Sequence, residues 1–143
     1  MEFLAYAMSM SKRTILASEQ RPGLRAYEDS VRLTLPEVVT KLREILGVRL
    51  VAYIGNVKST QPVAAWASGQ RSPGEVDADR LRLAFQIGGL LRERYSATTV
   101  QSWFKGMNPA LRDTAPARLL REGDPVEVGP DVLAAAKSFA FVG

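Results

Sequence analysis

Cysteine and histidine are both missing from the 143 residues of this chain. Without cysteine there is no disulfide, no thiolate metal ligand and no thiol nucleophile, and without histidine the commonest general base and metal ligand near neutral pH is missing too. Carboxylates remain, but no acidic pair stands in an apolar stretch of the kind that supports acid–base catalysis. The sequence therefore predicts a protein that is not an enzyme and that binds neither a cofactor nor a metal ion.

Long apolar runs are missing as well. No stretch approaches the roughly 18 consecutive apolar residues that a membrane-spanning helix needs. The first residues, MEFLAYAMSMSKR, include a short apolar run, but Glu2 precedes it and Lys12–Arg13 follow it, which reverses the charge order of a secretory signal. We therefore expect a cytoplasmic protein that makes no contact with a membrane.

What is present resembles the composition of a folded, water-soluble domain. Hydrophobic residues make up 46% and charged residues 24%, both within the globular range. The length suits one ordinary domain or two small helical modules that share a core. Nineteen basic residues against 15 acidic ones give a net charge of +4. This mild excess fits contact with nucleic acid or an acidic partner, and it fits an ordinary solvated surface almost as well.

Helical periodicity begins at residue 34. Over residues 35–46 the apolar side chains fall at the i, i+3, i+4 and i+7 positions of an amphipathic helix. Thr34 suits its N-cap, and Gly47 can end it with a positive φ. Residues 1–33 show no sustained period and contain the breaker run Arg21-Pro22-Gly23, so they are predicted to form a flexible or irregular arm.

Two short helices follow, over residues 48–54 and about 59–69. A tight turn joins them, and this arrangement predicts a helix-turn-helix. A longer helix is expected from Asp77 to about Tyr95. The interior pair Gly88–Gly89 marks either the close approach of a neighbouring helix or a kink.

The last third reads as short helices separated by glycine and proline. One is expected to end before Gly106, a second to span 116–121 with Thr114 as its cap, and a last one to span 131–140 after the break at Gly129–Pro130. No segment alternates long enough to predict a strand. The fold class is therefore all-α. A helix-turn-helix-like domain is expected over residues 34–95 and a smaller helical domain over 96–143.

The predicted helix-turn-helix contains a small set of candidate DNA contacts. A recognition helix reads base edges with polar side chains in its first turn, and basic residues beside it hold phosphates. The candidates are Lys58, Ser59, Thr60, Gln61 and Arg71. Pro62, Ala64 and Ala65 offer little to read, so the motif is open to a second interpretation, as a scaffold for packing and dimerisation. The apolar content of several short helices also predicts self-association, as a dimer.

The most specific pattern lies in the last third of the chain. Residues 103–111 read Trp-Phe-Lys-Gly-Met-Asn-Pro-Ala-Leu, and the spacing P-x-x-LL-x-x-G follows over residues 116–123. This order resembles the toxin-binding domain of the Xre/MbcA/ParS-like antitoxins, and the likeness covers about residues 34–143. The ending over residues 137–143 is similar to the apolar tail of the mycobacterial MbcA branch. The departure is Arg112–Asp113, where that family often has a glycine pair.

The resemblance implies an antitoxin of a type II toxin–antitoxin system, whose partner is a RES-domain toxin that consumes NAD. It implies inhibition by docking, with Lys137 as the cation near the mouth of the toxin's active site and with Phe139 and Phe141 as an apolar plug. Exposed aromatics near a chain end often mark a contact site. The other candidate docking residues are Trp103, Asn108, Pro109, Leu111, Leu119 and Leu120.

Two alternatives stay open for these residues. Trp103, Leu111 and Leu119 also fit simple core positions, and Lys137 also fits a solvated surface lysine. The helix-turn-helix would add operon autoregulation by binding operator DNA. The competing interpretation of the whole chain is a stand-alone helix-turn-helix transcriptional repressor without an enzyme partner.

Overall fold

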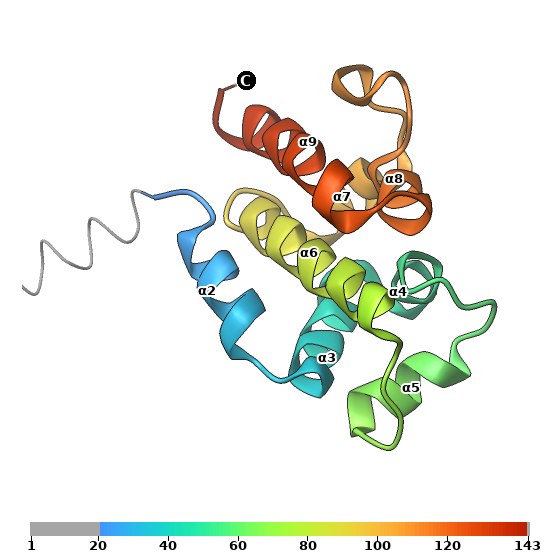
Figure 1. The fold of residues 1–143 in the computed structure, drawn as a ribbon. Coiled ribbons are helices and arrows are strands. Elements are labelled where there is room, and N and C mark those ends of the chain that lie inside the picture. Colours follow the sequence, from blue (N-terminus) through green and yellow to red (C-terminus); the bar gives the residue numbers. More distant parts are fainter. Residues whose placement is uncertain (1–20, 143) are drawn as a thin grey trace, which may run out of the picture.

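The computed structural model describes residues 21–142, and every regular element in that range is helical (Figure 1). This confirms the predicted all-α class. The elements are α2 (Leu24–Arg32), α3 (Leu35–Leu46), α4 (Val48–Ile54), α5 (Gln61–Ser68), α6 (Glu75–Arg92), α7 (Ala97–Lys105), η1 (Pro109–Leu111), α8 (Pro116–Glu122), α9 (Pro125–Lys137) and η2 (Ser138–Val142).

Helix α6 runs through the middle of the molecule. Figure 1 shows it between α2 and α3 on one side and α9 on the other. Its buried side chains join one hydrophobic core that extends from Val38 on α3 to Ala140 on η2. The helices expected in the 34–95 domain and those expected in the 96–143 domain therefore share this core.

Helix α3 begins after Thr34 and ends before Gly47, as the sequence predicts. The Thr34 hydroxyl accepts a hydrogen bond from the Glu37 backbone N–H, and the Glu37 carboxylate accepts one from the Thr34 N–H at 3.0 Å. This capping box satisfies two backbone donors at the start of the helix. At the other end Gly47 has φ +82° and separates α3 from α4.

Helices α4 and α5 pack closely across their connecting turn. Asn56 in the turn has φ 63°, and Gly69 ends α5 with φ 81° and ψ 5°. Val63 and Trp66 face the core, as their spacing predicts. A Cβ added at Gly55 would lie 2.8 Å from the Trp66 ring, so only glycine allows this approach.

Helix α2 corrects the prediction of an irregular arm through residue 33. Its buried face consists of the small residues Ala26 and Ser30, while the larger Tyr27 and Val31 are exposed. The usual apolar pattern is therefore reversed, and sequence periodicity does not detect the helix. Residues 1–20 lie outside the described part of the chain, as does the arm expected there.

The pair Gly88–Gly89 explains why α2 presents small residues. A Cβ added at Gly89 would meet the Ala26 Cβ at 2.8 Å, and one added at Gly88 would meet the Ile45 Cγ2 at 3.4 Å. Two neighbouring helices therefore approach α6 at its glycines. Of the two expectations for this pair, close approach is confirmed.

Several predicted boundaries are wrong. Helix α9 begins at Pro125 after the Asp124 cap and continues through Gly129–Pro130, where a break was expected. Gly129 is buried against Leu83, and a Cβ there would come within 3.1 Å of that side chain. Helix α6 begins at Glu75 rather than Asp77, and α8 has Ala115 rather than Thr114 at its N-cap.

Candidate functional site

Aromatic side chains of α7, of η2 and of the connection between α6 and α7 gather at the C-terminal end of the described chain. The Phe139 ring of η2 lies 4.9 Å from Tyr95 and 6.4 Å from Trp103, measured between ring centroids. Trp103 meets Phe104 edge-on at 5.3 Å. We call Tyr95, Trp103 and Phe139 the aromatic cluster. Pairs at these distances and angles have favourable ring electrostatics in addition to the buried area.

The main chain also fixes η2 in the aromatic cluster. The Tyr95 hydroxyl donates a hydrogen bond to the Phe139 carbonyl at 3.2 Å. Next to it, the Arg94 guanidinium lies 5.1 Å from the centroid of the Phe141 ring, within cation–π range. The predicted apolar plug is therefore packed against the helical body through Arg94 and Tyr95. Neither residue was among the predicted site residues.

Burial differs sharply within the aromatic cluster. The Phe139 side chain is 42% exposed, whereas Trp103 is 9% exposed. The Trp103 Nε1–H is buried and has no hydrogen-bond partner among the described residues. Phe139 is thus partly open to solvent while its contacts with Tyr95 and Trp103 hold it in place.

Lys137 lies apart from this cluster. It is exposed at the end of α9 and lines a groove of about 340 Å³ together with Tyr27 of α2 and Leu133 of α9. Its neighbours are therefore on the α2 side of α9.

The Asn108–Pro109 turn is built as the sequence predicts. The Asn108 Oδ1 accepts a hydrogen bond from the Ala110 N–H at 2.9 Å, and an isolated β-bridge joins Asn108 to Thr114. Arg112 and Asp113 then adopt φ values of 54° and 61°. Two consecutive non-glycine residues in the left-handed region are uncommon, and each adopts it at an energetic cost.

Three of the predicted docking residues are buried in the core of the protein. Leu111 is 6% exposed, Leu120 is fully buried and Trp103 is nearly so. Leu119 is half-buried and packs against the core, while Pro109 is exposed. The structure therefore gives core positions to Trp103, Leu111 and Leu120, and Phe139 is the predicted residue that combines a fixed ring with exposure.

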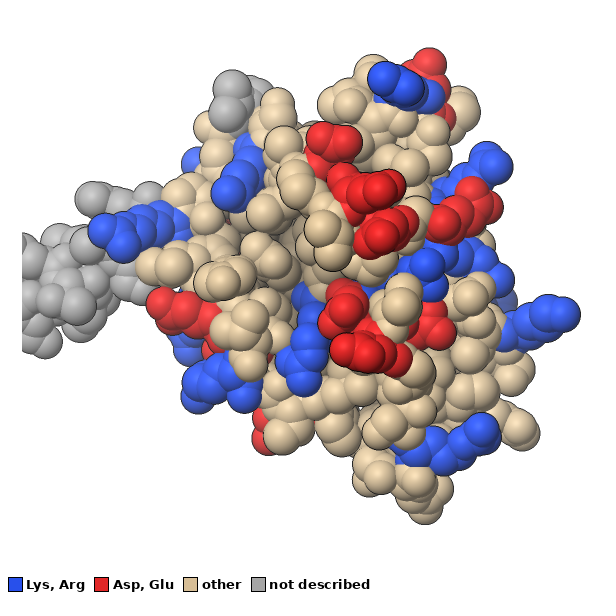
Figure 2. All heavy atoms as spheres, in the orientation of Figure 1, with Lys and Arg blue, Asp and Glu red and all other residues tan. Residues whose placement is uncertain are grey.

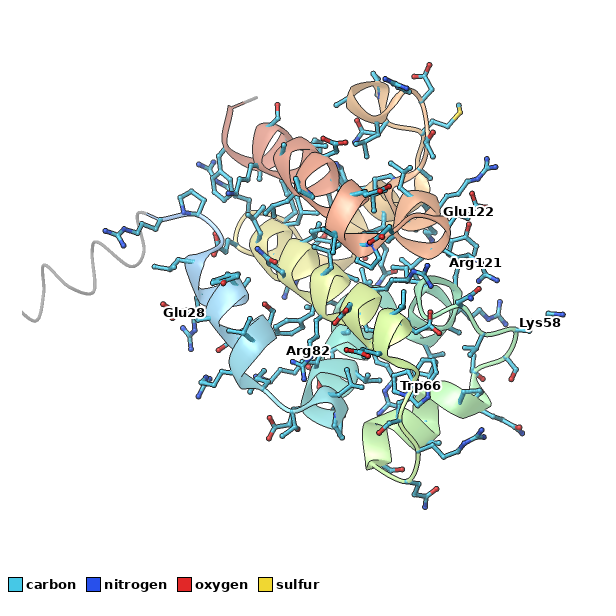
Figure 3. The ribbon with its side chains drawn as sticks, viewed as in Figure 1. Glu28, Lys58, Trp66, Arg82, Arg121 and Glu122 are labelled. Atoms are coloured by element: carbon cyan, nitrogen blue, oxygen red, sulfur yellow. The ribbon has the colours of Figure 1, made fainter. Side chains whose placement is uncertain are left out.

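The candidate DNA contacts are all exposed, and they lie at both ends of α5. Lys58, Ser59, Thr60 and Gln61 are exposed at the start of α5, and Arg71 is exposed beyond its end. Figure 3 shows Lys58 projecting from the loop before α5, and Figure 2 shows Lys and Arg side chains along the same edge of the molecule. Sequence reasoning missed Arg49 and Arg121, which line one groove with Lys58–Thr60.

Arg121 also connects α8 to α4. Its Nη1 donates a hydrogen bond to the Tyr53 carbonyl at 2.7 Å, and its guanidinium lies 4.7 Å from the centroid of the Tyr53 ring. Helix α8 is thereby joined to α4, the first helix of the predicted helix-turn-helix.

No protein-family model matches the chain, and no curated protein or solved structure matches it either. Within residues 21–142, no helix is both long enough and apolar enough to cross a membrane.

Proposed function

We propose that this protein is the antitoxin of a type II toxin–antitoxin pair, and that it inhibits a RES-domain toxin that consumes NAD. The protein acts by binding rather than by catalysis. The proposal rests first on the order of Trp103, the Asn108–Pro109 turn and the 116–123 spacing, which resembles the toxin-binding domain of the Xre/MbcA/ParS-like antitoxins.

The observation that carries the proposal is Phe139. Its ring is half-exposed, and contacts with Tyr95 and Trp103 already hold it in one position. Little conformational entropy is therefore lost when a partner covers it. Such rings supply much of the binding energy at protein interfaces. The aromatic cluster would dock beside the mouth of the toxin's active site and restrict access of NAD.

The backbone at Arg112–Asp113 supports the same proposal. Both residues have positive φ, where glycine is strongly favoured. The resembled family often has a glycine pair at this place. Arg112 and Asp113 therefore differ from the family in residue type, but their main chain has the positive φ values that a glycine pair would adopt.

The test is NAD consumption by a RES-domain toxin encoded beside this chain, measured with increasing amounts of the protein. Phe139→Ala should raise the concentration needed for half inhibition at least about tenfold, the loss expected for a binding anchor. Val76→Ala, a truncation of an exposed apolar side chain at the start of α6, should leave inhibition unchanged. Full inhibition by the Phe139 variant would contradict the proposed role of this ring.

Removing residues 139–143 separates docking from blocking. Helices α7, α8 and α9 remain, so we expect a measurable complex with weakened inhibition, provided that circular dichroism shows unchanged helical content after the loss of the buried Ala140. If the shortened protein inhibits fully, inhibition comes from the helical body instead, and the plug interpretation of Phe139 and Phe141 is wrong.

The second candidate function is transcriptional repression, favoured by the exposed set Lys58–Gln61 at the start of α5. As part of an antitoxin the same surface would bind operator DNA, and alone it would make the chain a repressor without an enzyme partner. Phosphate contacts make such binding sensitive to salt. Binding of a duplex from the chain's own promoter region, lost in Gln61→Ala without any effect of the chain on a RES-domain toxin, would favour this candidate.

A further inference from the structure

A groove with an apolar floor and a basic rim lies where α4, α7 and α8 meet. It encloses about 630 Å³, and its charged lining residues are Arg49, Lys105 and Arg118, with no acidic side chain among them. Among the described residues only Arg118 of these three has an ion-pair partner, Glu122 at 3.1 Å. The apolar lining residues are Leu46, Val48, Leu50, Tyr53, Ala115 and Ala117. This basic groove suits a segment that is apolar and acidic at once.

The first turn of α9 has that complementary character. Val126 is 83% exposed, so most of its apolar side chain is open to contact. Asp124 and Glu127 flank it, and both are exposed. The Asp124 Oδ1 accepts a hydrogen bond from the Val126 N–H at 2.9 Å, so the turn is held in one conformation. We call residues 124–127 the valine turn.

Helix α8 connects the basic groove to the valine turn. Arg118 lines the groove and the valine turn begins shortly after α8 ends at Glu122. A helix rises about 1.5 Å per residue, so roughly 10 Å of α8 separates the two surfaces. Figure 3 shows Glu122 at the edge of the molecule near α4, and Figure 2 shows acidic side chains gathered on the face beside it. A two-fold axis near α8 can then bring each valine turn to the groove of the other copy.

We propose that the chain forms a two-fold dimer in which the valine turn of one copy enters the basic groove of the second. Val126 covers apolar floor, while Asp124 and Glu127 approach the unpaired cations Arg49 and Lys105. The inference goes beyond inhibition of a toxin, because both halves of the interface belong to this chain. Its test therefore uses the full-length protein alone.

The first measurement is the mass of the protein by sedimentation at several concentrations. We expect a dimer that dissociates on dilution, with dissociation at least about tenfold easier in roughly 500 mM salt than in roughly 50 mM salt, because exposed charge pairs are screened. Val126→Asp should weaken the dimer by a similar factor while the helical circular dichroism stays unchanged, since this side chain is exposed within the monomer. A monomer at every concentration would overturn the proposal.

A charge exchange identifies the two surfaces. The groove variant is Arg49→Glu with Lys105→Glu, and the turn variant is Glu127→Lys; the hydrogen bonds and ion pairs of the described residues do not involve these side chains. Each variant alone should be mainly monomeric, because like charges then face each other at both contacts. Mixed together, the two variants should form a dimer again. In one contact the unchanged turn meets the unchanged groove, and in the other the lysine of the turn variant meets the glutamates of the groove variant.

The control is Arg25→Glu with Lys41→Glu, which makes the same change in net charge at exposed positions on α2 and α3. It should leave the dimer unchanged. A dimer that the groove variant does not weaken would place the interface elsewhere and overturn the proposal. A groove variant that remains a dimer but no longer binds the toxin or DNA would also overturn the proposal, because the groove would then bind that acidic partner instead.

Discussion

At the scale of single residues, Trp103 combines a buried ring with a buried donor that has no partner among the described residues. Truncating it to alanine removes the ring beneath Phe139 and should lower the free energy of unfolding by about 3–5 kcal/mol. Trp103→Phe keeps an aromatic ring and removes the unsatisfied N–H, whose burial costs about 1–3 kcal/mol. We expect this second variant to lose less than about 1.5 kcal/mol in urea denaturation. If both variants lower the free energy of unfolding equally, the Trp103 N–H makes a stabilising hydrogen bond in solution.

The glycine pair on α6 gives a second comparison between single residues. Alanine favours a helix interior over glycine by about 1 kcal/mol. At Gly88 the new Cβ would meet a flexible Ile45 side chain at 3.4 Å, so Gly88→Ala should be neutral or stabilising. At Gly89 it would meet the Ala26 Cβ at 2.8 Å, which cannot move without α2. Gly89→Ala should therefore destabilise the protein by about 1–3 kcal/mol, measured by the same denaturation. The reverse order would mean that α2 does not approach α6 so closely in solution.

At the scale of elements, α2 depends on one arginine of α6. The Arg82 Nη1 donates to the carbonyls of Ser30 and Leu33, at 2.7 and 2.9 Å, across the end of α2 (Figure 3). Hydrogen bonds from a charged donor contribute about 1.5–3 kcal/mol. In Arg82→Ala we expect hydrogen exchange over residues 24–32 to accelerate at least about tenfold while α3 stays protected.

The control for this element is Arg25→Ala, an exposed arginine on α2 itself. It should leave exchange over residues 24–32 unchanged. Faster exchange throughout the chain in the Arg82 variant would indicate that α2 is part of the global unfolding unit rather than a separately opening helix.

At the scale of the whole molecule, one core joins the two expected domains. Arg121 adds a polar link between α8 and α4. We therefore expect one cooperative unfolding transition. The chain has two tryptophans, Trp66 on α5 and Trp103 on α7, so each half has its own fluorescent reporter. Trp66→Phe and Trp103→Phe should each show a fluorescence midpoint that coincides with its own circular dichroism midpoint. Clearly separated midpoints in either variant would show that the halves unfold independently.

The sequence by itself determined the helical class and the elements whose signals are local. The capping pattern at Thr34 and Glu37, the Asn56 turn and the glycine at 69 act through neighbours within a few residues, so their effect can be read from the order of residues. The buried faces of α5 and α7 also follow the helical spacing of apolar residues, with Val63 and Trp66 three residues apart and Phe104 four after Val100.

The tertiary structure alone decided which small residues face a neighbour. Ala26 and Ser30 are buried because α6 presents a glycine to α2, and Gly129 is buried inside α9, where a Cβ would come within 3.1 Å of Leu83. It likewise decided that Leu111 and Leu120 belong to the core while Phe139 stays half-exposed on Tyr95. Contacts between residues distant along the chain set these outcomes, and a pattern of neighbouring residues does not record such contacts.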